Sequence, residues 1–196
     1  YRHQAPDEIS LTGSNVEVEI KSRDQEALLN RFSNSFISVG VEAKVITWEQ
    51  MTSLSGALSE VNLLPTKGLV EDLRSVKDYG EIARIEAAAF IADSALAEVW
   101  PLIEENLTER EIAVSLDQSM ILQGADERAF TTIVASGPNS ALPHACPGER
   151  ILQNGDLVVC DLGAVVNGYR SDMTRCKKLG ENMNNLEADL LGVVLK

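Results

Sequence analysis

The sequence predicts an α/β protein built in two parts, and two patterns carry this prediction. Strand-like and helix-like segments alternate up to Pro65, which breaks the pattern, and this alternation is the order of a layered α/β unit. After Lys77, helical segments come first and strands come later, which is an α+β order. We place the boundary near residues 73–76, so the expected parts are residues 1–74 and residues 75–196.

The first part begins with a strand followed by a helix. Residues 16–20 alternate strictly between apolar and charged side chains, which predicts a half-buried strand. Ser22 opens a capping box and predicts the start of a helix that ends at Gly40. A second strand over residues 41–47 and a second helix over about residues 49–60 complete a β-α-β-α order.

The second part opens with a long helix. Apolar residues recur at helical spacing over residues 82–99, and Pro101 stops this pattern. Thr108 and Glu111 form a capping box that predicts the start of the next helix. Apolar residues then follow at positions i, i+4 and i+8, and Gly124 ends the helix.

Composition excludes several classes of function. The formal net charge is -13 and no basic stripe is visible, so we expect no nucleic-acid partner. No apolar stretch is long enough to cross a membrane and no signal peptide is visible, so we expect a cytoplasmic protein without a membrane partner. The chain opens with Tyr1 and ends in an apolar run, and we expect the sequence to continue in both directions.

The three cysteines point to reduced thiols. Their number is odd and no two have CxxC spacing, which argues against a disulfide framework or a structural zinc site. Cys160 lies in an apolar run, so we interpret it as a small buried hydrophobic residue.

A hairpin carries the most informative residues. An apolar run that contains one carboxylate, Asp161, is followed by Asn167-Gly168, the strongest short-range signal of a type I′ turn. A two-residue loop there pairs Asp161 with Thr174 and Gly163 with Asp172. Asp172 is then diagonal to Asp161 on the same face, at about 7–8 Å between the backbones.

Two carboxylates at that range repel each other unless they are protonated or shared with cations. Two metal ions about 3.5–4 Å apart fit between such a pair. Gly163 would leave room for a ligand, and Thr174 can donate a hydrogen bond to Asp161. The alternative is a solvated polar face. Asp161 interrupts an apolar run, where an unpaired carboxylate would cost several kcal/mol, and this favours a functional site.

His144 is a second candidate site residue. It lies in a loop that prolines at positions 138, 143 and 147 stiffen, and this loop precedes the carboxylate hairpin. A lone loop histidine is more often inert than catalytic. The sequence contains no GxSxG, HExxH, GxGxxG or P-loop motif, so no other catalytic signature competes with the hairpin.

Taken together, these segments carry a family resemblance. They read SGPN at residues 136–139, PHA at 143–145, GDLVVCDLGA at 155–164 and GYRSDMTR at 168–175. This ordered block resembles the Xaa-Pro aminopeptidase and prolidase family, which has the pita-bread fold. Lys77-Asp78 resembles the start of the catalytic domain. The preceding residues resemble the later part of a creatinase-type N-terminal α/β domain, so the resemblance covers the middle of a typical member.

The resemblance implies roles for four residues. Asp161 and Asp172 match metal ligands, His144 matches a histidine that contacts the substrate, and Thr174 matches a residue beside the ligands. Members bind two divalent ions, usually manganese with cobalt or zinc possible, and these ions hold a bridging hydroxide that attacks Xaa-Pro bonds. The resemblance further implies proline-containing peptides as substrates and a homodimer.

This sequence also departs from the family pattern. The family's remaining ligands are one histidine and two glutamates, and no matching segment follows Arg175. Cys176-Lys177-Lys178 replaces the usual Thr-aromatic sequence.

Three alternatives stay open: a metal-free hydrolase similar to creatinase, a non-catalytic binding or dimerisation module on the same fold, and a methionine aminopeptidase. Two retained aspartates argue against the first, and the proline-rich His144 loop and preceding α/β part argue against the last.

Overall fold

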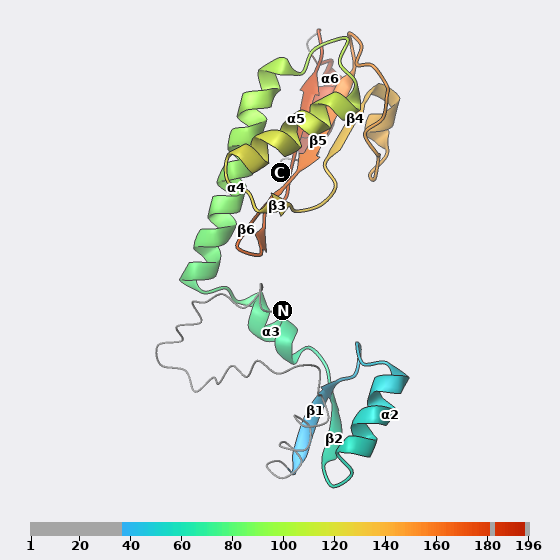
Figure 1. Cartoon of the computed structure of the whole chain (residues 1–196). Helices are drawn as coiled ribbons and strands as arrows, with labels where there is room; N and C mark the ends of the chain where they lie inside the picture. Colours follow the sequence, from blue (N-terminus) through green and yellow to red (C-terminus); the bar gives the residue numbers. More distant parts are fainter. Residues whose placement is uncertain (1–36, 181–182, 195–196) are drawn as a thin grey trace. The chain divides into compact units, whose positions relative to one another are not determined.

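The computed structural model describes residues 37–180 and 183–194. The chain divides into two compact units, Tyr1–Ser75 and Val76–Lys196, and each is considered by itself. Figure 1 shows the helices and strands of both units. The strand predicted at residues 16–20 and the helix predicted after Ser22 lie outside the described residues.

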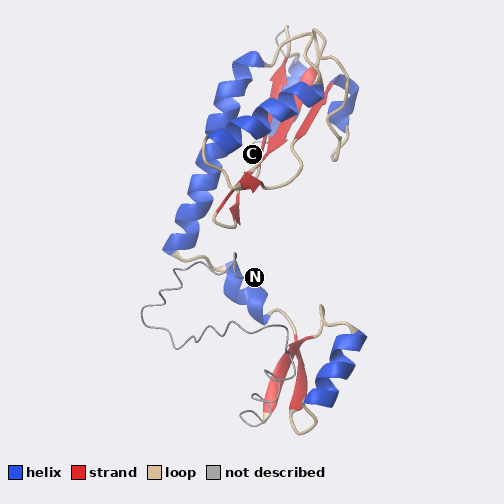
Figure 2. Ribbon diagram, in the orientation of Figure 1, coloured by secondary structure: helices blue, strands red, loops and turns tan. Residues whose placement is uncertain are grey.

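The first unit contains a parallel β-α-β arrangement. Strand β1 (Ser38–Glu42) pairs in parallel with β2 (Asn62–Thr66), and helix α2 (Trp48–Ala57) connects them, as Figure 2 shows. Thr47 caps α2 through reciprocal hydrogen bonds with Gln50. A short helix, α3 (Leu69–Ser75), follows β2. The predicted helix at about residues 49–60 is confirmed.

Three predictions in this unit are wrong. Gly40 does not end a helix but lies inside β1, where a Cβ atom would come within 2.8 Å of Thr66 Cγ2. The predicted strand over residues 41–47 ends at Glu42, because the chain turns there. Pro65, expected to break the pattern, lies in β2 opposite Val41. In the described part of the chain β2 is an edge strand, where a proline without a donor N–H is tolerated.

The second unit begins with the two predicted helices. They are α4 (Tyr79–Val99) and α5 (Glu109–Leu122), with a short 3-10 turn, η1 (Trp100–Leu102), after α4. The predicted Thr108–Glu111 capping box is present, and a similar box at Asp78 starts α4. Ile82 is 40% exposed, so the apolar stripe of α4 begins later than predicted. Its buried residues are Ala88, Ile91, Ala92, Ala95, Leu96 and Val99.

Two small sheets lie against these helices. One has the order β3-β6-β7 and the other β4-β5-β8, with α4 and α5 packed against their strands (Figure 2). The core between helices and sheets includes Leu116, Met120, Val134, Val158 and Leu162. The strands are β3 (Glu127–Arg128), β4 (Ile133–Ser136), β5 (Leu157–Leu162), β6 (Ala164–Val166), β7 (Tyr169–Arg170) and β8 (Met173–Lys178).

A long hairpin runs through both sheets and is fastened to α4. Strands β5 and β6 form its outgoing arm, and β7 and β8 form its return arm. The Tyr169 hydroxyl donates to Glu81 at 2.8 Å, and the Ser171 hydroxyl donates to the Ala88 carbonyl at 3.0 Å. Lys177 donates to the carbonyls of Trp100 and Ile103 at 2.7 and 3.0 Å. The hairpin is therefore held near the start, at the middle and beyond the end of α4.

One further helix, α6 (Asn185–Val194), was not predicted. Asn184 caps it through reciprocal hydrogen bonds of 2.9 Å with Glu187, and Lys178 of β8 donates to Glu187 at 2.7 Å. In the described ranges, no helix has both the length and the apolar character needed to cross a membrane.

Candidate metal site

The predicted hairpin register is confirmed. Val166 pairs with Tyr169 across the turn, and Asp161 pairs with Thr174 further along the two arms. Asn167 and Gly168 both have positive φ, at 48° and 82°, as a type I′ turn requires. Because no bulge intervenes, Asp172 lies two positions before Thr174 and is diagonal to Asp161 on the same face.

Gly163 has a different role from the one predicted. A Cβ atom there would lie 2.0 Å from the Ser171 carbonyl oxygen, so the space is filled by backbone and is not left for a ligand. Ser171 is buried and its hydroxyl also accepts from the Ala164 N–H at 3.0 Å. This close approach lies where the hairpin passes from one sheet to the other, directly before Asp172. The glycine therefore fixes the backbone that carries Asp172.

The two aspartates influence each other electrostatically. Asp161 belongs to β5, in which Val158, Cys160 and Leu162 point into the core and Asp161 points to the opposite, partly exposed face. Desolvation raises the pKa of Asp161 above its ordinary value of 3.8, and the nearby Asp172 carboxyl raises it further. The pair is thus destabilised in its doubly ionised form and would be relieved by a shared cation.

Thr174 has the contact that the sequence predicted. Its hydroxyl donates to Asp161 Oδ1 at 3.0 Å, which opposes the rise in the pKa of Asp161. A hydrogen bond of this kind fixes the orientation of a carboxylate before a metal ion arrives.

His144 stands apart from these carboxylates. It is exposed and lies in a turn after the 3-10 segment η2 (Gly137–Ala141). Within residues 37–180 and 183–194, no hydrogen bond or ion pair joins His144 to Asp161 or Asp172. The structure therefore places the two aspartates and Thr174 together and does not bring His144 to them.

The donor set of this site is incomplete by itself. Asp161 and Asp172 offer carboxylate oxygens, the donors that hard divalent cations prefer. Among the residues that the structure describes, no group of three or more histidine, cysteine, aspartate or glutamate side chains could hold a metal ion. The residues present therefore fit part of a metal site, with two carboxylates that could contribute donors.

The cysteines take no part in this donor set. Cys146, Cys160 and Cys176 are free, and Cys160 is buried, as predicted. Desolvation raises the pKa of the Cys160 thiol to about 12. Such a thiol is a poor nucleophile and a poor ligand at neutral pH.

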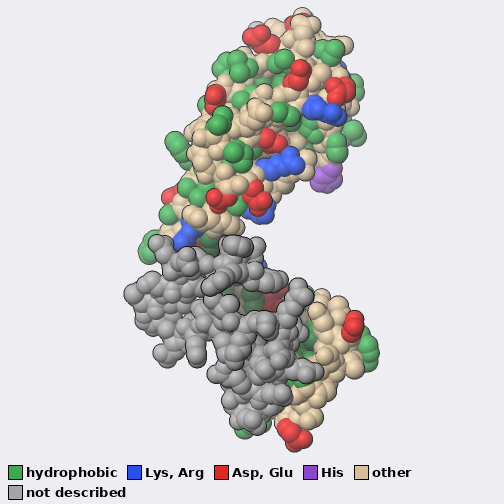
Figure 3. All heavy atoms as spheres, in the orientation of Figure 1, with side chains coloured by type: hydrophobic (Ala, Val, Ile, Leu, Met, Phe, Trp, Pro, Cys, Tyr) green, Lys and Arg blue, Asp and Glu red, His purple; other side chains and the backbone are tan. Residues whose placement is uncertain are grey.

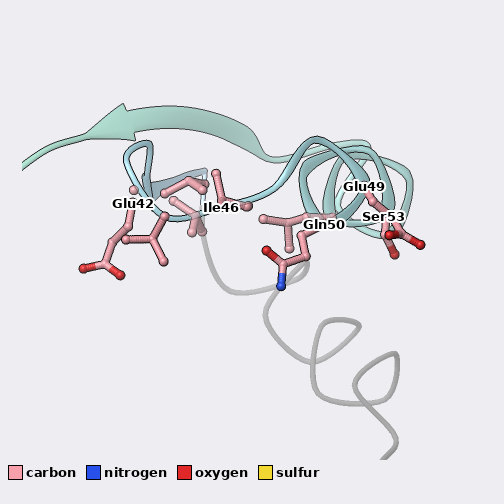
Figure 4. A pocket seen from close by; sticks show the side chains of 10 residues that line it. Glu42, Ile46, Glu49, Gln50 and Ser53 are labelled. Carbon is pink, nitrogen blue, oxygen red and sulfur yellow. The ribbon is translucent and has the colours of Figure 1, made fainter.

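A groove of about 680 Å³ lies in the first unit, between β1 and α2. Figure 4 shows its labelled polar side chains, Glu42, Glu49, Gln50 and Ser53, together with Ile46. The groove belongs to the first unit, whereas the hairpin belongs to the second. On the face of the molecule shown in Figure 3, acidic side chains are scattered among basic and apolar ones.

Comparison with known proteins identifies the family. Residues 83–196 match metallopeptidase family M24, and residues 1–76 match the creatinase/prolidase N-terminal domain. The chain belongs to metallopeptidase family M24. Its mixed helix and strand content agrees with the predicted combination of a creatinase-type α/β domain and a pita-bread domain.

Relatives of this M24 chain include proteins named as Xaa-Pro peptidases and others named only as peptidases. An Xaa-Pro dipeptidase of Pyrococcus furiosus is 41% identical over 128 residues, which cover 65% of this chain and 36% of that protein. An uncharacterised peptidase of Bacillus subtilis is 37% identical over 149 residues, covering 76% and 42%. An X-Pro aminopeptidase structure from Thermotoga maritima has a TM-score of 0.82 at 32% identity, covering 93% and 52%. The chain spans about half the length of these relatives or less.

The sequence analysis of this M24 chain did not reveal a buried polar network at the two ends of the His144 loop. Glu109, the first residue of α5, is 1% exposed and accepts hydrogen bonds from both ends of that loop. Arg150 pairs with Asp156 at 2.6 Å beside it. One signal in the sequence could have revealed Glu109. It directly follows Thr108, and the capping box of Thr108 and Glu111 gives this second acidic residue no role.

Proposed function

We propose that this chain is part of a metal-dependent peptidase that hydrolyses Xaa-Pro bonds, with Asp161 and Asp172 as metal ligands. The single observation that carries the proposal is the diagonal placement of these aspartates on one face of the hairpin. Membership of family M24 and the Xaa-Pro peptidases among the relatives support the reaction. Residues 75–196 would be the first half of the catalytic domain and residues 1–74 the end of the N-terminal domain.

Each proposed site residue has a specific task. Asp161, which accepts a hydrogen bond from Thr174, and Asp172, which follows the close approach of Gly163 to Ser171, would bind divalent cations through their oxygens. When bound, such cations lower the pKa of a water molecule and polarise the peptide carbonyl. Oxygen donors suit manganese, so we propose two manganese ions, with cobalt or zinc as alternatives.

His144 would bind the substrate beside the scissile bond. Its exposed place in the loop after η2 leaves its imidazole accessible to a peptide. The proposed substrates are proline-containing peptides. We further propose a cytoplasmic protein that forms a homodimer, as the family resemblance implies, and sedimentation velocity would test the dimer.

Metal binding by this chain tests the ligand assignment. Mn²⁺ should broaden the amide signals of residues 161, 172 and 174 in nuclear magnetic resonance spectra of the chain. The double variant Asp161→Asn, Asp172→Asn should abolish this broadening. Asp126→Asn is a matched control, because Asp126 lies near the hairpin turn and bonds Asn167 but is no proposed ligand. Unchanged broadening in the double variant would refute the assignment.

A metal-free, creatinase-like hydrolase or a non-catalytic binding module are the other outcomes of this test. Both predict that the wild-type chain shows no specific Mn²⁺ effect at the hairpin. Release of proline from Xaa-Pro dipeptides by a protein that contains this chain and a complete ligand set, dependent on Mn²⁺ and lost with the two substitutions, would support the peptidase. Peptide binding without turnover by a protein that contains a complete ligand set would instead support the binding module.

A further inference from the structure

Glu109 is a buried carboxylate that helix capping does not explain. Thr108 and Glu111 already satisfy the N-terminus of α5 through their reciprocal hydrogen bonds. Glu109 points elsewhere and is 1% exposed. A carboxylate buried to this degree destabilises the fold unless hydrogen bonds replace its hydration. Its partners therefore indicate what the residue stabilises.

These partners are the two ends of the loop that carries His144. At the first end, the backbone N–H and the hydroxyl of Ser136 each donate to Glu109 Oε1 at 2.8 Å. Asn139 Nδ2 donates to both oxygens at 3.0 and 3.2 Å. At the other end, the Gly148 N–H donates to Oε2 at 3.2 Å. One carboxylate thus joins segments that His144 separates in sequence.

The charge of Glu109 suits this arrangement. Desolvation raises the pKa of Glu109, but the hydrogen bonds from Asn139, Ser136 and Gly148 together outweigh it and leave the pKa below its ordinary value. The position at the start of α5 also favours a negative charge. The ionised form is therefore the one that the loop ends bind.

A second pair supports the same loop end. Arg150 Nη1 donates to the Ser136 hydroxyl at 2.5 Å and to Asp156 at 2.6 Å. Gly137 has a φ of 51°, and a Cβ atom there would lie 2.5 Å from Asp156 Oδ1 and 2.6 Å from Arg150 Nη2. The loop entrance is thus fixed by packing as well as by charge.

The middle of the loop has far weaker support. Its backbone hydrogen bonds are local, from Leu142 to Asn139 at 3.0 Å and from Ala145 to Leu142 at 3.3 Å. His144 itself is exposed. The position of His144 therefore depends on where the two loop ends are held.

We propose that Glu109 is a positioning residue for His144, acting through Ser136, Asn139 and Gly148. This inference rests on the proposed function, because it assigns His144 the task of meeting the substrate beside the metal ions. Among the described residues, no hydrogen bond or ion pair joins the Glu109 side chain to Asp161 or Asp172, so we assign it no direct part in the reaction. Its effect is to close the base of the loop and so to define where His144 lies.

The test compares Glu109→Gln and Asn139→Ala with Glu111→Ala in the whole chain. Glu111→Ala removes the helix cap, but it leaves the loop contacts intact. Amide hydrogen exchange over residues 138–148 should accelerate at least about tenfold in the first two variants and not in the third. Asn139→Ala keeps the experiment decisive if Glu109→Gln does not fold, since it buries no new group.

A spectroscopic measurement separates positioning from general stability. The His144 imidazole Hε1 signal, assigned with His144→Gln, should be broadened by Mn²⁺ in the wild-type chain. Glu109→Gln and Asn139→Ala should change that broadening while Mn²⁺ affinity stays as in the wild type. If exchange in the loop and the His144 signal match the wild type in both variants, the positioning role is refuted. If Mn²⁺ affects no wild-type signal, the proposed function fails, and hydrogen exchange alone still decides the role of Glu109.

Discussion

The Thr174 hydroxyl donates a hydrogen bond of 3.0 Å to Asp161 Oδ1 across the strand pair β5–β8. This bond orients a carboxylate that is otherwise destabilised by desolvation and by the neighbouring Asp172. Thr174→Val should therefore weaken Mn²⁺ binding about tenfold or more, because the carboxylate loses its preferred orientation. Isothermal titration calorimetry would measure the affinity. Thr174→Ser, which keeps the hydroxyl, should bind nearly as the wild type does, and equal affinity in all three proteins would contradict the prediction.

Asp161→Asn should stabilise the metal-free chain at neutral pH. The pKa of Asp161 is raised in the folded state, so the folded chain binds more protons than the unfolded chain as the pH rises past 3.8. Wild-type stability is therefore lost as the pH rises through the raised pKa. Asparagine keeps an acceptor for Thr174 but carries no charge. Thermal unfolding at several pH values should show a gain that disappears at low pH, and a constant difference between the two proteins would count against it.

Gly163→Ala should destabilise the second unit by about 2 kcal/mol or more. The new Cβ atom would lie 2.0 Å from the Ser171 carbonyl oxygen, so the backbone before Asp172 must shift. Gly192→Ala is the matched control, since nothing lies within 4 Å of its added atom and α6 should gain up to about 1 kcal/mol. Urea unfolding measures both effects. Wild-type stability in Gly163→Ala would show that the close approach does not matter.

The Arg150–Asp156 pair should make stability fall in acid. Burial alone would raise the pKa of Asp156, but hydrogen bonds from Arg150 and the Gln153 N–H lower it below 3.8. The contribution of the pair is complete above that ordinary value and is lost as the pH falls through the lower, folded-state pKa. Asp156→Asn should cost about 2–3 kcal/mol at pH 7 and much less near pH 2. Chemical unfolding at both pH values checks this, and an equal cost at both would exclude the ion pair as the cause.

The hairpin was predictable from sequence because its determinants are local. Asn167-Gly168 fixes the turn type, and the period of two along each arm then fixes which residue faces Asp161. The helices α4 and α5 were predictable for the same reason, from apolar spacing and from the Thr108 capping box. Each of these features is determined by residues that are close to one another in the sequence.

What sequence could not reveal depends on long-range contacts. The role of Gly163 is set by the Ser171 backbone, and that of Glu109 by a loop that begins 27 residues later. Strand β2 was obscured by Pro65, because only its pairing with β1 shows that a proline is tolerated there.

The hairpin is attached near the start, at the middle and beyond the end of α4, and this limits how the sequence can change. Sliding one arm by two residues would keep apolar side chains inside, so alternation alone does not forbid that slip. Such a slip would pull Tyr169, Ser171 and Lys177 away from their partners together. Likewise, one residue inserted between Glu81 and Ala88 would rotate the helix by about 100° and lengthen it by about 1.5 Å. The length of helix α4 therefore fixes the position of the hairpin along it. We expect point substitutions in α4 to be tolerated far more readily than insertions or deletions.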